Sequence, residues 1–183
     1  MSKLNIGAGS DIRAGFINHD IAQLEGIDVV HDLNIFPWPW QNESVEEIVM
    51  NDVVEHLIEF TKTMEELHRI LTPGGVARIR VPHMGSWSFY ADPTHKRAFV
   101  EATFLFFDPR SEFCKERFYY SDARFHVENV SLICAPFIPF FTIPGIGAFR
   151  VKAKLLRNII GLIDHYFIRN LIQLPFLRVW TCH

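Results

Sequence analysis

The sequence predicts an α/β fold built on a parallel β-sheet. Up to residue 81, short apolar runs alternate with turns, as they do where strands of a parallel sheet follow one another. The first run breaks into a Gly-Ala-Gly turn at residues 7–9, and one strongly periodic helix ends at Pro-Gly-Gly, residues 73–75. These observations indicate strands and at least one helix in alternation along the first half of the chain.

The apolar runs predict strands at residues 3–6, 16–20, 28–31, 47–50 and 76–81, with another near the end of the chain at residues 177–182. In residues 76–81 the alternation has a period of two, which places Ala77, Ile79 and Val81 on one face of the sheet. Arg78 and Arg80 are then expected on the opposite face.

The helix is predicted over residues 60–71. Its apolar residues recur at spacings of four, three and four, namely Phe60, Met64, Leu67 and Leu71. The Pro-Gly-Gly sequence that follows is typical of a helix end.

The connections between the first three strands are short. Residues 7–15 are fewer than the dozen or so that a parallel crossover usually takes, and residues 21–27 are too few for a full helix. We therefore expect a shortened first crossover with a stunted or absent helix, and a thinly covered flank of the sheet.

Beyond Pro82 the sequence becomes aromatic-rich and punctuated by proline, in SWSFYADPTHKRAF, FLFFDPRSEF and APFIPFFTIPGIG. Long insertions of this kind after a sheet strand often form a substrate lid. Residues 152–174 have the pattern of an amphipathic helix. Charged residues interrupt it too often for a membrane span, so we expect it to pack on the domain, with peripheral membrane contact as the alternative.

Length and composition predict one domain over residues 1–183, with a cofactor-binding half at 1–82 and a substrate or lid region at 83–183. A net charge of −3 gives no electrostatic reason to expect nucleic acid. The isolated cysteines and a core strand that begins almost at the first residue favour a reducing compartment, the cytoplasm. The cysteines are Cys114, Cys134 and Cys182.

The segment LNIGAGSDIRAGFINHD has the order expected of an adenosine site. Gly7 and Gly9 allow a tight turn that brings backbone amides close to a ligand, and Asp20 ends the next strand, where an acid can accept both ribose hydroxyls. A dinucleotide fingerprint needs a third small residue where Ile12 stands, which favours S-adenosylmethionine over NAD. The alternative is an ordinary turn with Asp20 as a cap.

Five segments in register carry a family resemblance: LNIGAGS, INHDI, VVHDLN followed by FPW, VMNDVVEHL and ELHRILTPGGVARIRVP. Together they resemble the small class I S-adenosylmethionine-dependent methyltransferases over residues 4–82. The resemblance implies a Rossmann-like methyltransferase fold, with a mostly parallel central sheet flanked by helices and one antiparallel strand near the C-terminus. It also implies S-adenosylmethionine as the cofactor.

Carried over residue by residue, the resemblance places Gly7 and Gly9 beneath the methionine portion and Asp20 on the ribose. Asp32 and the backbone of Leu33 would meet the adenine ring. Asn51 and Asp52 would lie beside the methionine end. Turn capping is the alternative for Asp32, and a structural role is the alternative for Asn51 and Asp52.

Two further parts of the resemblance are interpreted as structural. Glu55 and His56 belong to the Glu-His-Leu signature and are expected to orient the loop and cap the helix. The aromatic residues of FPWPW, at 36–40, are expected to pack rather than to line the ligand, although an aromatic ring near a sulfonium would gain cation–π attraction.

The segment after the fifth strand supplies candidate catalytic groups. His83, Asp92 and His95 follow the edge where the parallel strands of open sheets bind ligands. For a hydroxyl acceptor a general base is useful, and we expect His95 to be that base, oriented by Asp92 or His83. The alternative is that Asp92 caps a turn before Pro93 and His95 is a surface residue.

No metal site is predicted. A zinc site of Asp92, His95, His83 and His126 is the alternative, but no pair of these has the spacing of a known ligand motif.

The sequence therefore predicts a methyltransferase acting on a small molecule or a glycan, by O- or N-methylation. The competing hypotheses are a non-catalytic methyltransferase-like module that serves as a membrane or protein adaptor, and a nucleotide-dependent oxidoreductase.

Overall fold

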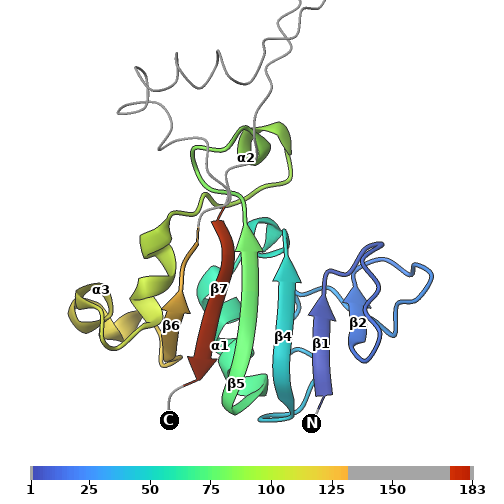
Figure 1. Ribbon diagram of the computed structural model, residues 1–183, viewed down its shortest axis with the longest axis horizontal. Coiled ribbons are helices and arrows are strands. Elements are labelled where there is room, and N and C mark those ends of the chain that lie inside the picture. Colours follow the sequence, from blue (N-terminus) through green and yellow to red (C-terminus); the bar gives the residue numbers. More distant parts are fainter. Residues whose placement is uncertain (1, 132–173, 182–183) are drawn as a thin grey trace, which may run out of the picture.

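The computed structural model describes residues 2–131 and 174–181. Its centre is a seven-stranded sheet with the order β3-β2-β1-β4-β5-β7-β6 (Figure 1). The strands are β1 (Ser2–Ile6), β2 (Ile17–Asp20), β3 (Val29–Val30), β4 (Val45–Asn51), β5 (Leu71–Val81), β6 (Phe125–Asn129) and β7 (Leu174–Thr181). The helices are η1 (Val54–His56), α1 (Phe60–Ile70), α2 (Trp87–Ala91), η2 (Glu101–Phe107), α3 (Glu112–Glu116) and η3 (Phe118–Tyr120).

Strands β1 to β5 pair in parallel, and β7 pairs antiparallel with both β5 and β6. The mostly parallel sheet, its five predicted strands and the C-terminal strand are thereby confirmed, although β3 comprises only Val29–Val30. Strand β6 was not predicted. Because the parallel strands run in one direction, their carboxyl ends meet at one edge of the sheet, the upper edge in Figure 1.

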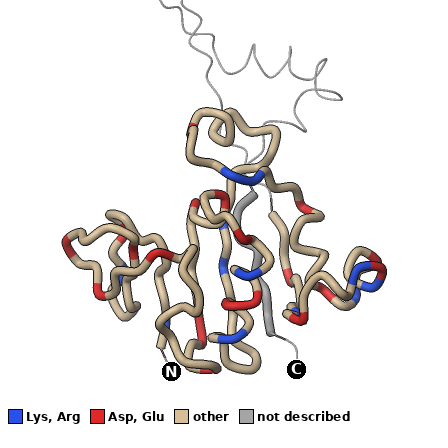
Figure 2. Tube along the Cα trace, turned by 180° about the vertical axis from the view of Figure 1, so that it is seen from behind, with Lys and Arg blue, Asp and Glu red and all other residues tan. Residues whose placement is uncertain are grey.

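One face of the sheet is apolar and covered by α1. Leu4, Ile6, Ile48 and Met50 are fully buried there, as is Met64 of α1. Figure 1 shows α1 behind the strands, and Figure 2 shows the molecule from that side. The predicted helix is confirmed but ends at Ile70, because the next residue already pairs with β4 as the start of β5.

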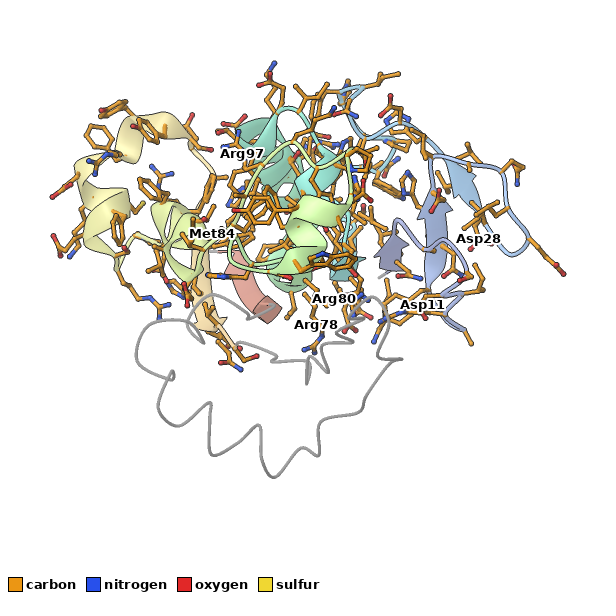
Figure 3. All side chains as sticks on the ribbon, turned by 90° about the horizontal axis from the view of Figure 1, so that it is seen from above. Asp11, Asp28, Arg78, Arg80, Met84 and Arg97 are labelled. Atoms are coloured by element: carbon orange, nitrogen blue, oxygen red, sulfur yellow. The ribbon has the colours of Figure 1, made fainter. Side chains whose placement is uncertain are left out.

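The opposite face carries charged side chains, as the alternation in β5 predicted. Glu47 accepts hydrogen bonds at 3.0 Å from Lys3 and at 3.0 Å from Arg78, so a cation–anion–cation row crosses three neighbouring strands. Arg80 pairs with Asp52 at the upper end of this row. Figure 3 shows Arg78 and Arg80 on one side of the sheet and Arg97 on the other, where Arg97 lies over the ring of Phe60.

The expected shortening of the first crossover is confirmed, because no helix lies between β1 and β2 or between β2 and β3. Two strand side chains hold the first connecting loop instead. Asn18 Oδ1 accepts hydrogen bonds from Asn5 Nδ2 at 3.0 Å and from the Arg13 amide at 2.9 Å. Asn5 Nδ2 also donates to the Asp11 carbonyl. Hydrogen bonds from buried side-chain amides therefore hold this loop against the sheet, whereas in longer crossovers a packed helix does so.

The aromatic insertion after β5 divides into parts with different roles. Phe99, Phe104 and Phe107 are buried, and their rings lie 5.3 to 5.7 Å from that of Phe60. Phe104 and Phe107 of FLFFDPRSEF, together with Phe99, therefore complete the core over α1, because burying large aromatic rings is strongly favourable. Helix α2, in the first half of SWSFYADPTHKRAF, lies above the upper edge of the sheet (Figure 1).

The predicted helix at 152–174 and the third aromatic segment lie outside the described residues, except that Leu174 begins β7. Within residues 2–131 and 174–181, no helix has the length and apolar character needed to cross a membrane.

Asp108 joins the insertion to β6. It is 3% exposed, and it accepts hydrogen bonds from the Arg110 guanidinium and from the Val127 amide at 2.9 Å. Burial by itself would raise the pKa of this carboxyl, but these hydrogen bonds outweigh it and lower the pKa to about 2. The ionised carboxylate thus stabilises the folded state.

Replacing Asp108 with Asn is expected to lower the free energy of unfolding at pH 7 by about 2 kcal/mol, the free-energy equivalent of this pKa shift. Because the folded pKa lies below the ordinary value, the stabilisation is present above about pH 4 and disappears as the pH falls towards 2. Urea unfolding at pH 7 and pH 3 measures both effects, with the exposed Asp122→Asn variant as control. Equal stability of wild type and Asp108→Asn at pH 7 would contradict this account.

Candidate cofactor and acceptor site

A pocket of about 240 Å³ opens at the carboxyl ends of β1, β2 and β4 and beside the loop after β3. Its lining contains five of the predicted cofactor residues, Gly7, Asp20, Asp32, Leu33 and Asp52. The remaining lining residues are His19, Ile21, His31, Asn34, Val53, His56 and Leu57. The topology explains this gathering, since the parallel strands all end at the same edge of the sheet.

The turn after β1 depends on glycine. Gly7 and Gly9 have φ values of 67° and 51°, in the left-handed region that glycine adopts without a steric penalty. Gly9 does not line the pocket itself, but its amide donates to Asp20 Oδ2 at 2.8 Å. Asp20 Oδ1 accepts from the Ala22 amide at 3.0 Å. The turn and the acid at the end of β2 are therefore held together, with the carboxylate in the pocket wall.

Replacing Gly7 with Ala is expected to destabilise the protein much more than replacing Gly9 with Ala. A Cβ at Gly7 would lie 2.2 Å from Val53 Cγ2, whereas a Cβ at Gly9 would have no atom of the described residues within 4 Å. Both variants force a left-handed alanine, at a cost of about 1 to 2 kcal/mol, and only Gly7→Ala adds the overlap of roughly 1 to 3 kcal/mol. Urea unfolding without ligand measures the difference, and equal losses in the two variants would contradict the close approach of Val53.

The loop after β3 forms the far wall of the pocket. Asp32 Oδ1 accepts from the Asn34 amide at 2.9 Å, a turn-capping contact, while the residue still lines the pocket. Trp38 is 2% exposed, and its indole Nε1 donates to the Leu33 carbonyl at 3.0 Å. The interpretation of FPWPW as a packing segment is confirmed for Trp38, which holds Leu33 in place.

Asn51 is the last residue of β4 and Asp52 follows it, and the two have different surroundings. Asp52 has a φ of 55°, lies in the wall of the pocket and pairs with Arg80. Asn51 lines neither this pocket nor the one described below, and its buried Oδ1 has no hydrogen-bond partner within the described part of the chain.

Two histidines in the wall were not predicted. His19 is 1% exposed and contacts the His31 carbonyl through Nε2 at 3.0 Å; burial lowers its pKa. His31 lies one strand further along the sheet. Each precedes a predicted cofactor acid, in the His-Asp pairs 19–20 and 31–32, and this repetition at two strand ends was the available signal.

A second pocket, of about 220 Å³, adjoins the first. It is lined by Asp52, Glu55, His56, Pro82, Ser88, Asp92 and His95. Asp52 and His56 line both pockets, so the two share a wall. A ligand in the first pocket and a ligand in the second would thus be neighbours.

The loop over residues 92–96 is tied to the segment after β4. The Lys96 amide donates to the Glu55 carbonyl at 2.7 Å, and Thr94 Oγ1 contacts His56 Nδ1 at 2.9 Å. Asp92 Oδ1 accepts from the Thr94 amide at 2.8 Å and from the Thr94 hydroxyl at 2.6 Å. These hydrogen bonds lower the pKa of Asp92. Asp92 therefore caps the turn as well as lining the second pocket.

His95 lies at the centre of this arrangement. Its ring stacks on Phe89 and meets that of His56 edge to face, with centroids 4.7 Å apart. Because the Phe89 carbonyl can only accept, the 2.8 Å contact with His95 Nδ1 assigns the hydrogen to Nδ1. Nε2 then carries the free lone pair, and it lies 4.0 Å from both Glu55 Oε1 and Asp92 Oδ2.

His83 lies elsewhere. It is 6% exposed, lines neither pocket, accepts a hydrogen bond from the Gly85 amide through Nδ1 at 3.1 Å, and has Nε2 3.7 Å from Glu101. The structure brings Asp92 and His95 together and leaves His83 out of their cluster.

Glu55 was expected to help cap the helix, and that expectation is wrong. The N-cap of α1 is Glu59, and no side chain caps it. Glu55 instead lies in the wall of the second pocket, 0% exposed, and neither carboxylate oxygen accepts a hydrogen bond from another described residue. Burial away from water raises its pKa to about 8. The sequence shows an acid shortly after the fourth strand, but it does not show that this acid is buried.

Comparisons with known proteins agree with this architecture. The sequence model of a family described as a methyltransferase domain matches residues 5–79. A search of the curated proteins finds no significant match.

Solved structures show the same fold. A SAM-dependent methyltransferase from Archaeoglobus fulgidus superposes with a TM-score of 0.57 at 17% identity, over 98% of this chain and 85% of that one. An S-adenosylmethionine-dependent methyltransferase from Mesorhizobium loti gives a TM-score of 0.56 at 11% identity, over 98% of this chain and 90% of that one. The domain match over residues 5–79, the fold and the pocket at the strand ends agree with the resemblance of this sequence to the class I S-adenosylmethionine-dependent methyltransferases.

Proposed function

We propose that S-adenosylmethionine binds in the first pocket. Asp20 would hold the ribose hydroxyls, Gly7 and Gly9 would pass beneath the methionine portion, and Asp32 with the Leu33 backbone would meet the adenine. Asn51 and Asp52 would lie near the methionine end, with Asp52 in direct reach. The lining of the first pocket supports this assignment, since Gly7, Asp20, Asp32 and Leu33 all contribute to it and the Gly9 and Ala22 amides hold Asp20 in its wall.

The acceptor is proposed to bind in the second pocket. The observation that carries this proposal is the shared wall of Asp52 and His56, which places the two ligands side by side. The cofactor supplies an electrophilic methyl group on its sulfonium. Holding the acceptor atom in line with that group and excluding water is worth on the order of 7 to 11 kcal/mol of barrier.

His95 is the proposed base for a hydroxyl acceptor. Its Nδ1 is held by the Phe89 carbonyl, so Nε2 is the atom that takes the acceptor proton. The resulting imidazolium would lie 4.0 Å from Asp92, whose negative charge stabilises it. In this assignment His83 has no catalytic part.

The charges of the second pocket favour a particular acceptor class. Asp52 and Asp92 line it together with Glu55, whose raised pKa of about 8 keeps it mostly protonated at pH 7, and no lysine or arginine within residues 2–131 lines it. Such a lining disfavours phosphate and carboxylate groups and suits donors such as hydroxyls and amines. We therefore propose O- or N-methylation of a small molecule or of a sugar.

We also propose a location in the cytoplasm, which the isolated cysteines support because they form no disulfide framework.

Calorimetric titration with S-adenosylhomocysteine tests the proposal first, because the reaction product binds without an acceptor. We expect micromolar binding of S-adenosylhomocysteine and none of NADH. Binding of neither would instead favour the adaptor hypothesis, and binding of NADH alone would favour the oxidoreductase.

A further inference from the structure

Three ligand-type side chains converge in the second pocket. Glu55 and His56 come from η1, and His95 comes from the loop after α2. One ligand atom from each lies within 4.8 Å of the others. Two imidazole nitrogens and a carboxylate form a donor set that suits Zn²⁺ and similar first-row ions, and that Mg²⁺ and Ca²⁺, which prefer oxygen, do not favour.

The hydrogen bonds around the two histidines leave the same ring nitrogen free in each. The Thr94 hydroxyl has one hydrogen, which it donates to Asp92 Oδ1, so it must accept from His56 Nδ1. His95 Nδ1 donates to the Phe89 carbonyl. Both Nε2 atoms thus keep their lone pairs. Histidines that bind metal ions are typically fixed in this way, with the other ring N–H bonded to a carbonyl or to a polar side chain.

Glu55 supplies an independent observation. The side chain is 0% exposed and lies in the pocket wall, yet both carboxylate oxygens are without a hydrogen bond from any other described residue. A buried carboxylate of this kind is unfavourable unless a cation or a hydrogen-bond donor meets it. Among the described residues, no arginine or lysine lines the pocket to do so.

We propose that Glu55, His56 and His95 bind one divalent transition-metal ion in the second pocket, through a carboxylate oxygen and the two Nε2 atoms. His95 Nε2 and Glu55 Oε1 are 4.0 Å apart. Two ligands bonded tetrahedrally to Zn²⁺ are roughly 3.4 Å apart, so this pair must approach by about 0.6 Å and no pair in the group, all within 4.8 Å, by more than about 1.4 Å.

Ion binding has a consequence for catalysis. His95 Nε2 has a single lone pair, so the ion and the acceptor proton compete for it, and a bound ion should slow methyl transfer to a hydroxyl. This consequence rests on the proposed function. Ion binding itself does not.

The test uses the full-length protein, stripped of metal with a chelator. Co²⁺ is titrated while its visible absorption is recorded, and Zn²⁺ and Mg²⁺ are titrated by calorimetry. We expect one Co²⁺ site with the absorption bands of a protein-bound ion, competition by Zn²⁺ and little binding of Mg²⁺. Glu55→Gln and His95→Gln should each weaken Co²⁺ binding about 100-fold or more, since even changes in the residues behind metal ligands cost 10- to 100-fold.

His126→Gln serves as the matched control, because His126 lies on β6 and lines neither pocket. S-adenosylhomocysteine binding by each variant shows that it is folded. Failure of wild type to bind Co²⁺, or equal binding by wild type, Glu55→Gln and His95→Gln, would overturn the ion site. Failure to bind S-adenosylhomocysteine with Co²⁺ binding intact would overturn the cofactor assignment instead, so the two failures are distinguishable.

Discussion

Replacing His95 with Ala is expected to slow methyl transfer by about 10²- to 10⁴-fold, the usual contribution of a positioned general base. S-adenosylhomocysteine affinity should stay within a few-fold of wild type, because His95 lines only the second pocket. The loop should also keep its position, since backbone and Thr94 contacts hold residues 92–96 without the imidazole.

Labelled S-adenosylmethionine, with an acceptor identified by screening sugars, phenols and amines, gives the rate. His83→Gln is the matched control, a buried histidine outside both pockets, and its rate should be close to that of wild type. Unchanged turnover in His95→Ala would remove His95 from the reaction. A loss confined to His83→Gln would transfer the catalytic role to that residue.

Replacing Asp20 with Ala is expected to weaken cofactor binding by about 1 to 3 kcal/mol, roughly 5- to 150-fold in Kd, since charge-assisted hydrogen bonds to the ribose are lost. Part of that loss comes from the turn, because Asp20 also accepts from the Gly9 and Ala22 amides. Asp20→Asn retains one oxygen acceptor and should lie between wild type and Asp20→Ala.

Calorimetry with S-adenosylhomocysteine measures these affinities. Asp11→Ala is the control, because Asp11 lies in the same loop, pairs with Arg13 and lines neither pocket. Affinity that is the same in Asp20→Ala as in wild type would take Asp20 out of the site.

Local patterns predicted most of the sheet and its helix. The strands before residue 82 and α1 each have their signal within a few neighbouring residues, in the period of the apolar side chains and in the Pro-Gly-Gly that ends the helix. The shortened crossover was also predictable, since chain length limits what a connection can contain. Strand β6 was missed because the alternation in FHVEN contains only two apolar residues, Phe125 and Val127, and the strand depends on pairing with β7.

The first pocket could be predicted from the sequence because its acids lie at or just after the ends of parallel strands, and the ends of parallel strands lie at one edge of the sheet. The second pocket did not. It exists because residues 92–96 fold onto the segment after β4, and the contacts between Lys96 and Glu55 and between Thr94 and His56 span about forty residues of chain. No local pattern reports such a contact.

The sequence by itself determined the α/β alternation, the glycine turn, the acids at the strand ends and the face on which Arg78 and Arg80 lie, because backbone geometry and side-chain period express these over short distances. Tertiary structure alone decided that Glu55 is buried without a hydrogen-bond partner in the described part of the chain, that His95 presents Nε2 to the pocket and that His83 turns towards Glu101. Burial and the direction of a hydrogen bond depend on neighbours distant in the chain, and folding brings those neighbours together.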